Sequence, residues 1–152
     1  GELEIIDRLK PECSAEDYKP YDNSQPSNVL LCAHNIERLP ELFSPGDGVD
    51  RLYINFCNPW PAARCHKRRL THTRQLEAYK PLLAPGGEVW FKTDNDSLYL
   101  ATRRYFAEAG YTVFFDTKDL HASGDTENVV TEHELMFTAQ GIPTKALRAR
   151  LG

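Results

Sequence analysis

Short apolar runs alternate with longer amphipathic stretches along most of the chain, from about residue 28 onward. Apolar runs that are bounded by turn residues are typical of buried strands. The pattern predicts strands at Asn28–Ala33, Arg51–Phe56, Glu88–Thr93 and Tyr111–Phe115. A further strand is expected near Glu134–Thr138, and another, or its continuation, near Thr144–Ala149, where a terminal hairpin with an antiparallel member would suit both runs.

The stretches between these runs carry apolar residues at helical spacing. The pattern predicts helices at Ile36–Phe43, Arg69–Leu83 and Leu98–Ala109, and a long loop at His121–Val130. Pro85-Gly86-Gly87 is expected to end the second helix, because proline and glycine both disfavour helical backbone. Strands that are separated by helices favour an α/β fold with a mainly parallel sheet and helices on both faces.

Residues 1–27 follow a different pattern. Apolar residues near the start could form a short helix, but residues 10–27 are polar and contain three prolines. We therefore expect an irregular, unassigned N-terminal segment at residues 1–27 and one globular part at residues 28–152.

Composition favours a soluble, cytoplasmic globule, with 41% hydrophobic and 11% aromatic residues. No apolar run approaches the roughly 20 residues that span a membrane, and the start of the chain has no signal-peptide pattern. The cysteines, Cys13, Cys32, Cys57 and Cys65, form no CxxC pair. Cys32 and Cys57 lie in strand-like runs, so buried reduced thiols are favoured over metal ligands.

A basic cluster stands out against the net charge of −4. Its members fall within eleven residues and are Arg64, His66, Lys67, Arg68, Arg69 and Arg74. Phosphate binding needs only a local basic patch, so the overall acidity does not exclude a nucleic acid. A solvated face is the commoner explanation of such a cluster, and the cluster alone leaves both interpretations open.

Polar residues follow three of the predicted strands, at His34-Asn35, Asn58-Pro59-Trp60 and Thr93–Asp96. In an open α/β sheet, ligands bind at the carboxyl ends of the strands, so these side chains are expected to share one cleft. Asn58–Pro61 offers an amide that can hydrogen-bond a base and an indole that can stack on it. An ordinary tight turn with Trp60 in the core is the alternative.

Four segments occur in a specific order: INFCNPWPAARCHKRRLTH, FKTDND, DLHAS and TEHE. Together they make the region from about Asn28 to Leu151 resemble the bacterial tRNA (guanine-N7)-methyltransferase family. The family pattern is close to F-x-D-P-W-P, then R-H-x-K-R-R, F-K-T-D and T-x-x-E. The resemblance implies a Rossmann-like class I methyltransferase fold with an antiparallel C-terminal strand, and S-adenosylmethionine-dependent methylation of guanine N7 in the tRNA variable loop.

The resemblance also implies roles for individual residues. Asn58 and Asp94 match catalytic positions, and His34, Asn35 and Asn58 match contacts to the S-adenosylmethionine cofactor. The residues that match contacts to the target guanine are Asp94, Thr131, Glu132, His133 and Glu134. Those that match the segment meeting tRNA are Arg64, Cys65, His66, Lys67, Arg68 and Arg69. The expected partner is tRNA, with no membrane and no metal, and the protein is expected to be a monomer or a homodimer.

These residue types suit the chemistry. Guanine N7 carries a free lone pair, so it can attack the methyl group without prior removal of a proton. The enzyme has to align the two reactants and tolerate positive charge on the purine. Asp94 and Glu134 could accept hydrogen bonds from the guanine N1 and N2 donors and compensate that charge, although most carboxylates are simply solvated.

The sequence departs from the family pattern at four positions. Asn58 replaces Asp, Cys65 takes the place of a His that here stands one position later, Ala62 stands where Lys is common, and His34 stands where an acidic residue is common. An Asn still accepts a hydrogen bond, as in other N-methyltransferases with an N-P-P-aromatic loop. Asn58 is therefore compatible with activity.

The cofactor half of the family pattern is missing. No predicted strand is followed by a G-x-G loop, and no acidic ribose-binding residue follows one strand later. In the family strand order 3-2-1-4-5-7-6, Asn28–Ala33 matches strand 3, so the first two strands are lacking. We expect a fragment that binds S-adenosylmethionine poorly, with a non-catalytic tRNA-binding fragment or a degenerate member as the alternative function. A different base or a protein substrate is disfavoured by Asp94, Thr131 and Glu134.

Overall fold

The computed structural model describes residues 28, 29 and 31–152, so the expectation for residues 1–27 lies outside the described residues. The chain divides into two compact units, Gly1–Leu42 and Phe43–Gly152. In the described part of the first unit, the 3-10 helix η1 spans Ile36–Glu41. The side-chain oxygen of Asn35 accepts a hydrogen bond from the Glu37 N–H at 3.0 Å and begins this helix. The predicted helix is thus present in a shorter, tighter form.

The strand predicted at Asn28–Ala33 is wrong for the described residues of that run, none of which lies in a strand. Val29 and Leu31 are 47% and 44% exposed, and Cys32 is exposed rather than buried. A strand is stable only when a neighbour satisfies its backbone N–H and C=O groups. Among the described residues no strand pairs with this run, so its apolar sequence does not suffice.

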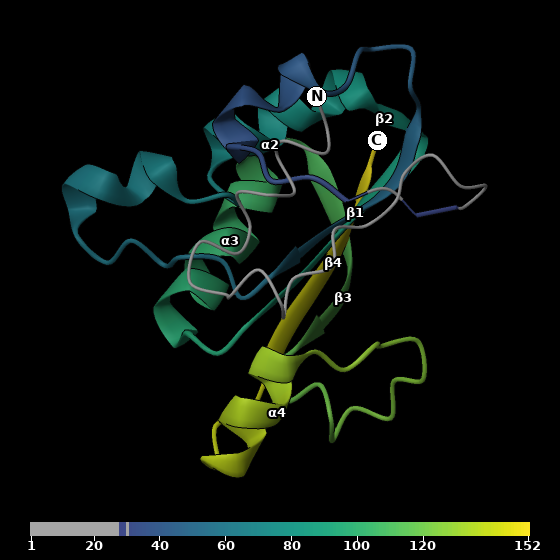
Figure 1. The fold of residues 1–152 in the computed structure, drawn as a ribbon. Helices are drawn as coiled ribbons and strands as arrows, with labels where there is room; N and C mark the ends of the chain where they lie inside the picture. Colours follow the sequence, from purple (N-terminus) through teal and green to yellow (C-terminus); the bar gives the residue numbers. More distant parts are fainter. Residues whose placement is uncertain (1–27, 30) are drawn as a thin grey trace, which may run out of the picture. The chain divides into compact units, whose positions relative to one another are not determined.

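The second unit is built on a four-stranded sheet of order β1-β2-β4-β3 (Figure 1). Its strands are β1 (Val49–Asn55), β2 (Leu83–Thr93), β3 (Tyr111–Thr117) and β4 (Lys145–Leu151). β1 and β2 are parallel, and β4 lies between β2 and β3, antiparallel to both. This arrangement matches the 4-5-7-6 half of the family strand order 3-2-1-4-5-7-6, with the predicted antiparallel C-terminal strand.

The helices of this unit are α2 (Thr73–Tyr79), α3 (Asp96–Glu108) and α4 (Glu132–Ala139). α3 packs on β2, β3 and β4, and α2 packs on α3, on the same side of the sheet (Figure 1). The core between them contains fully buried side chains of Leu76, Val89, Leu98, Phe106 and Leu147. In the described part of the unit, the opposite face carries the 118–131 loop instead of the expected helices.

The strand predicted near Glu134–Thr138 is wrong, because this segment forms α4. The Thr131 hydroxyl accepts a hydrogen bond from the Glu134 N–H at 3.3 Å and caps the helix. Thr131-x-x-Glu134 is a sequence pattern typical of helix N-termini, which explains why a helix begins here instead of the predicted strand. No terminal hairpin forms among the described residues, since β4 pairs with β2 and β3 instead.

The predicted Arg69–Leu83 helix is broken into shorter pieces. A 3-10 helix η2 covers Ala63–Arg68, α2 follows, and a 3-10 turn η3 covers Lys80–Leu82. Pro85-Gly86-Gly87 lies inside β2, where the pairing with β1 jumps from Val49↔Leu83 to Arg51↔Glu88. These residues therefore form a bulge within the strand.

Candidate active site

The carboxyl ends of β1 and β2 lie side by side. Asn55 pairs with Lys92 across the two strands, and the Phe56 N–H donates to the Lys92 carbonyl at 2.9 Å. The polar residues that follow each strand, Asn58 and Asp94, therefore leave the same edge of the sheet. This confirms the arrangement of the strand ends, although His34 belongs to the first unit and is not placed relative to them.

The Asn58–Pro61 loop, hereafter the NPWP loop, leaves β1 in a strained conformation. Phe56 and Trp60 have φ angles of 54° and 40°, although neither is glycine. Such angles cost about 1 to 3 kcal/mol each and persist only where the surroundings impose them. The Asn58 Oδ1 accepts from the Trp60 N–H at 3.0 Å, which leaves the exposed Asn58 side-chain NH₂ without a partner among the described residues. Imposed strain at a strand end is typical of a functional loop.

Asp94 presents a half-buried carboxylate that has no partner in the described part of the chain. Its neighbours are occupied: Thr93 Oγ1 accepts from the Asn95 N–H, and Asn95 Oδ1 accepts from the Leu98 N–H to begin α3. Lys145 Nζ donates to the Asp94 backbone carbonyl at 2.8 Å and pairs with Asp96 at 3.1 Å. The surrounding contacts fix the backbone of Asp94 and leave its side chain free for a ligand.

The first turn of α4 lies beside the end of β1. The Phe56 ring stacks on His133, with ring centroids 6.0 Å apart, and on Phe137 at 5.6 Å. Glu132 and His133 are exposed, while Thr131 is half-buried and caps the helix. The segment Thr131–Glu134, which was predicted to contact the guanine, thus approaches the end of β1 through His133.

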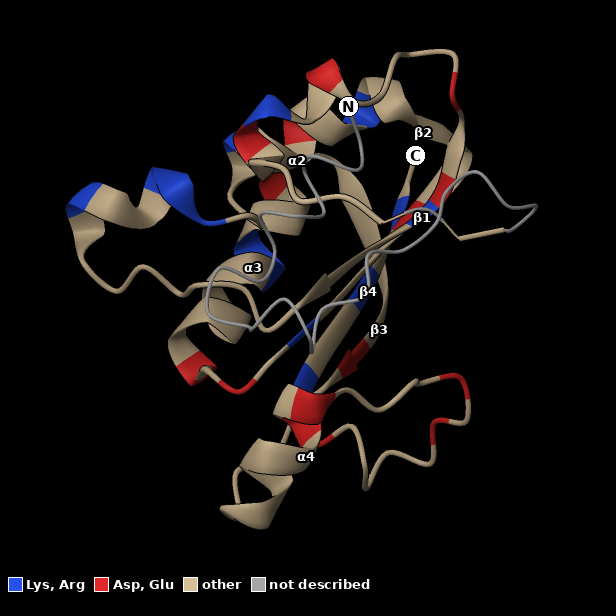
Figure 2. Ribbon diagram, in the orientation of Figure 1, with Lys and Arg blue, Asp and Glu red and all other residues tan. Residues whose placement is uncertain are grey.

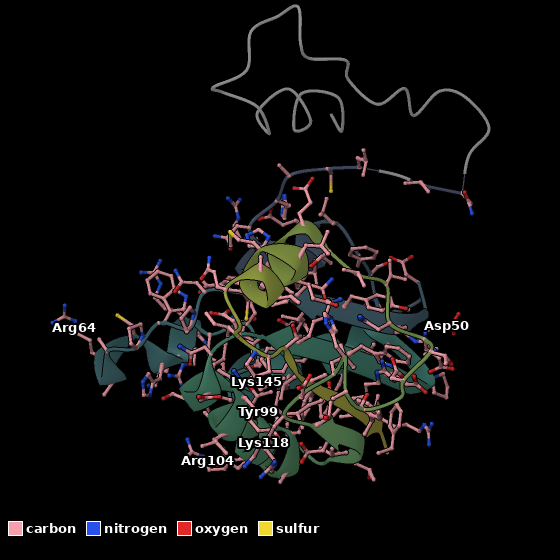
Figure 3. The ribbon with its side chains drawn as sticks, turned by 90° about the horizontal axis from the view of Figure 1, so that it is seen from below. Asp50, Arg64, Tyr99, Arg104, Lys118 and Lys145 are labelled. Atoms are coloured by element: carbon pink, nitrogen blue, oxygen red, sulfur yellow. The ribbon has the colours of Figure 1, made fainter. Side chains whose placement is uncertain are left out.

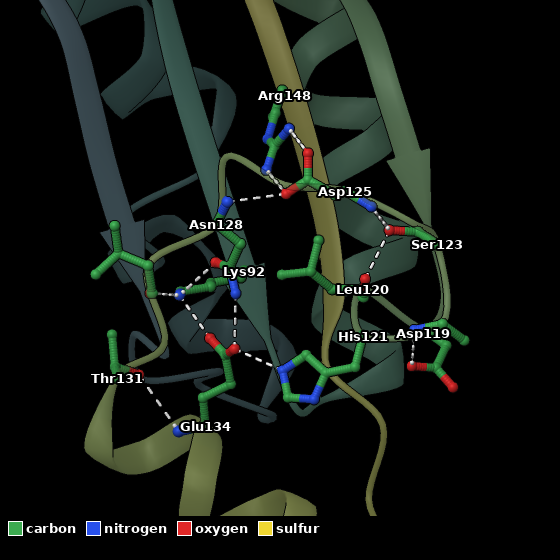
Figure 4. A network of polar contacts seen from close by, with 12 residues as sticks. Lys92, Asp119, Leu120, His121, Ser123, Asp125, Asn128, Thr131, Glu134 and Arg148 are labelled. Carbon is green, nitrogen blue, oxygen red and sulfur yellow. Dashed lines mark hydrogen bonds and ion pairs between the residues drawn. The ribbon is translucent and has the colours of Figure 1, made fainter.

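Glu134 is fully buried and is bound by other protein groups (Figure 4). Its Oε1 lies 2.5 Å from Lys92 Nζ, and its Oε2 lies 2.6 Å from His121 Nε2 and 2.8 Å from Asn128 Nδ2. Burial by itself raises the pKa of Glu134, but the bonds from Lys92, His121 and Asn128 outweigh it and hold the pKa below its usual value. A charged Glu134 on α4 therefore connects this helix to β2 through Lys92 and to the 118–131 loop through His121 and Asn128.

A second ion pair fastens the same loop to β4. Arg148 donates to both carboxylate oxygens of Asp125, at 2.7 and 2.8 Å (Figure 4). Its guanidinium carbon also lies 3.8 Å from the centroid of the Trp90 ring and 4.3 Å from that of Phe115. The bonds from Arg148 lower the pKa of Asp125. Asp125 also accepts from the Asn128 N–H at 2.9 Å, which links the two networks.

A hollow of about 410 Å³ lies on the face of the sheet that carries this loop. Of the predicted site residues, Thr131 lines it, as do the Glu134 partners Lys92 and Asn128. Asn58 and Asp94 do not. The free Asp94 carboxylate and the hollow are therefore separate features of the second unit.

The predicted RNA-binding segment divides into exposed and buried residues. Arg64, Lys67 and Arg68 are exposed on η2, which carries much of the blue at the left of Figure 2, and Arg64 projects outward in Figure 3. Arg68 lies over the Trp60 ring at 4.1 Å, and His66 Nε2 contacts the Pro61 carbonyl at 3.1 Å. Cys65 is half-buried, and the remaining member, Arg69, is only 4% exposed.

Two predicted cofactor contacts have local partners within the first unit. His34 Nε2 lies 3.1 Å from the Arg38 carbonyl and 3.3 Å from Glu41, and Asn35 caps η1. The other predicted contact, Asn58, stands on the NPWP loop. Of the three predicted cofactor contacts, only Asn58 lies in the second unit, at the end of β1, and the described residues include no glycine loop of the G-x-G type.

Lys92, His121 and Asn128 are not among the predicted site residues, although all three bind the Glu134 carboxylate. Lys92 and His121 stand inside the FKTDND and DLHAS segments that carried the family resemblance.

Burial raises the pKa of the Cys57 thiol to about 11, so this free cysteine stays protonated at neutral pH, as a structural thiol does. In the described part of the chain, no cluster of His, Cys, Asp or Glu could hold a metal, and no helix is long and apolar enough to cross a membrane.

Comparisons with known proteins agree with this architecture. The family model described as "Putative methyltransferase" matches residues 7–147. The fold is similar to that of the "putative methyltransferase" solved in complex with the Trm112 methyltransferase activator of Haloferax volcanii, with a TM-score of 0.50 over 84% of this chain and 64% of that one, at 14% identity. The fold and the polar strand ends therefore define a Rossmann-like class I methyltransferase, a class that generally uses S-adenosylmethionine.

Two curated relatives identify the particular methyltransferase family. The chain is 46% identical over 134 residues to a tRNA (guanine-N(7)-)-methyltransferase of Ruminiclostridium cellulolyticum, covering 88% of this chain and 57% of that protein. It is 50% identical over 127 residues to that of Clostridium botulinum (strain Alaska E43), covering 84% and 58%. The chain belongs to the tRNA (guanine-N7)-methyltransferase family. It spans less than two thirds of the length of these relatives.

Proposed function

We propose that this chain is part of an enzyme that transfers a methyl group from S-adenosylmethionine to N7 of a guanine in the variable loop of tRNA. The observation that carries this proposal is the half-buried, unpartnered Asp94 carboxylate, at a sheet edge shared with the strained NPWP loop. A half-buried carboxylate that no described protein group binds can accept hydrogen bonds from a ligand. The guanine N1–H and N2–H₂ groups are such donors, and family membership supports this assignment.

The protein's task in this reaction is alignment. Bound S-adenosylmethionine supplies an electrophilic methyl group, and the N7 lone pair attacks it without a general base. Asp94 holds the Watson–Crick edge of the guanine and offsets the positive charge that grows on the ring. Asn58, on the NPWP loop, faces the reaction from the end of β1. Glu134 does not contact the guanine in this proposal. It supports the site indirectly, because its buried hydrogen bonds hold Lys92 and the 118–131 loop in place.

The tRNA backbone is proposed to meet Arg64, Lys67 and Arg68, which are exposed on η2. Arg68 covers the Trp60 ring, so the basic surface and the NPWP loop are continuous. Cations that neutralise phosphates release counterions and make affinity depend on salt.

Replacement of Arg68 by Gln is expected to weaken tRNA binding and to reduce the slope of log K against log salt concentration by about one, the loss of one phosphate contact. Filter binding from low to moderate salt measures this slope. Lys118→Gln is the matched control, because Lys118 is an exposed cation with no described contact. An unchanged slope for Arg68→Gln would show that η2 is a solvated surface only.

Calorimetry with S-adenosylmethionine tests the cofactor part of the proposal. We expect no appreciable binding to the 152-residue chain, because the predicted contacts, His34, Asn35 and Asn58, do not include the glycine loop that binds the methionine end of the cofactor. Each missing polar partner costs about 1 to 3 kcal/mol, so affinity should fall about 1,000-fold or more. A chain extended to the length of the relatives is the control and should bind. A micromolar dissociation constant for the 152-residue chain would contradict this assignment.

A further inference from the structure

Arg69 is a buried cation without a carboxylate partner in the described part of the chain. Its Nε donates to the Pro59 carbonyl at 2.8 Å, and its Nη1 donates to the Tyr105 hydroxyl at 2.9 Å. Both acceptors are neutral. A charged side chain that is buried against neutral partners has a high desolvation cost, so stability alone is a poor reason to place it there.

The backbone that follows Arg69 is held in place by several contacts. The Tyr79 hydroxyl donates to the Leu70 carbonyl at 2.7 Å, and the Thr71 and Thr102 hydroxyls are 2.7 Å apart in the core. The ring of Tyr105, which belongs to α3, packs on His72 with centroids 4.9 Å apart. The backbone next to Arg69 and one end of its guanidinium are therefore both held by residues of the α2–α3 layer.

The element that Arg69 holds is the NPWP loop. Pro59 directly follows Asn58, and Trp60, next in the chain, has the strained φ of 40°. Proline has no N–H, so the loop has few backbone donors with which to fix itself. The bond from Arg69 to the Pro59 carbonyl is thus a main tether of the loop to the helical layer.

We propose that Arg69 and Tyr105 form a positioning clamp that sets the height of Asn58 above the end of β1, and that Arg69, unlike its neighbour Arg68, does not contact RNA. This proposal rests on the proposed function. Displacement of a positioned group by about 1 Å can cost about 100-fold in rate. A guanidinium donates in two fixed directions at once, which the single ammonium group of lysine does not reproduce.

The test compares adjacent arginines in the chain extended to the length of the relatives. Arg69→Gln and Tyr105→Phe each break the clamp, Arg69→Lys is the conservative variant, and Arg68→Gln is the matched control for RNA contact. Three readouts are taken on each: tRNA affinity against salt, the single-turnover rate of methyl transfer at saturating tRNA, and hydrogen exchange of the peptide that contains Trp60.

We expect Arg69→Gln to lower the single-turnover rate about 100-fold and Tyr105→Phe to lower it about threefold to tenfold, the worth of one neutral hydrogen bond. Arg69→Lys should recover part of the rate. The salt slope should stay at its wild-type value in all three variants, whereas Arg68→Gln lowers it by about one. Exchange of the Trp60 N–H should accelerate in Arg69→Gln and Tyr105→Phe.

A lower salt slope in Arg69→Gln, with unchanged exchange at Trp60, would overturn the clamp and return Arg69 to the RNA surface. If Arg69→Gln fails to fold, Tyr105→Phe decides, because it keeps the ring and removes only the hydroxyl: a wild-type rate and wild-type exchange in that variant overturn the clamp. A wild-type enzyme that transfers no methyl group would instead refute the proposed function. The exchange readout would still report whether Arg69 holds the loop.

Discussion

Replacement of Asp94 by Asn is expected to lower the rate of methyl transfer about 100-fold while leaving the fold intact. The carboxylate has no partner among the described residues, so its loss breaks no contact that the fold needs. Hydrogen bonds to charged groups contribute about 1.5 to 3 kcal/mol each, which corresponds to about 10-fold to 150-fold in rate. Single-turnover kinetics on the chain extended to the length of the relatives measures the effect, and thermal unfolding checks the fold.

Asp96→Asn is the matched control for this prediction. Asp96 stands two residues later, its side chain is 80% exposed, and it pairs with Lys145 at 3.1 Å. Its replacement removes the same charge from the same edge and should change the rate by less than about twofold. A rate for Asp94→Asn that is as high as that of Asp96→Asn would remove Asp94 from the site.

Replacement of Glu134 by Ala is expected to lower the free energy of unfolding by about 3 to 5 kcal/mol, because it leaves the Lys92 ammonium group buried without its counter-charge. The Lys92 side chain is 9% exposed and, among the described residues, keeps only the Asn128 and Val129 oxygens as partners. Urea unfolding followed by tryptophan fluorescence measures the change. Lys92→Met combined with Glu134→Met should cost less, since no unpaired charge remains. A loss below about 1 kcal/mol in Glu134→Ala would contradict the account of this network.

The stabilisation from Glu134 also has a defined pH window. The pKa of Glu134 is lower in the folded state than its unfolded value of about 4.3. Its contribution is therefore fully present above about pH 5 and is lost as the pH falls through the folded pKa. The difference in unfolding free energy between wild type and Glu134→Gln should accordingly shrink in acid.

The sheet could largely be predicted from the sequence, because its strands are apolar runs with clear ends. β1, β2, β3 and β4 each overlap a predicted run, and the order β1-β2-β4-β3 agrees with the family order. The failures have physical causes. Asn28–Ala33 is apolar but has no pairing strand among the described residues, and Glu134–Thr138 looked like a strand although Thr131 begins a helix there.

The strand ends were predictable for a similar reason, since the carboxyl ends of parallel strands must meet at one edge. The partners of buried charges were not. Lys92 and Glu134 are 42 residues apart, and only the folded long loop brings His121 and Asn128 to the same carboxylate. Arg69 and Arg68 are adjacent and chemically identical in the sequence, and only burial separates the clamp from the exposed surface.

The most direct test of the central claim uses two tRNA transcripts that differ at one atom. One carries guanine at the target position of the variable loop, and the other carries 7-deazaguanine, which keeps the N1 and N2 donors but has carbon in place of N7. With labelled S-adenosylmethionine and the chain extended to the length of the relatives, we expect 7-methylguanosine in the first tRNA. The second should bind with similar affinity and accept no methyl group. Equal labelling of both transcripts would place the reaction at another atom and contradict the account.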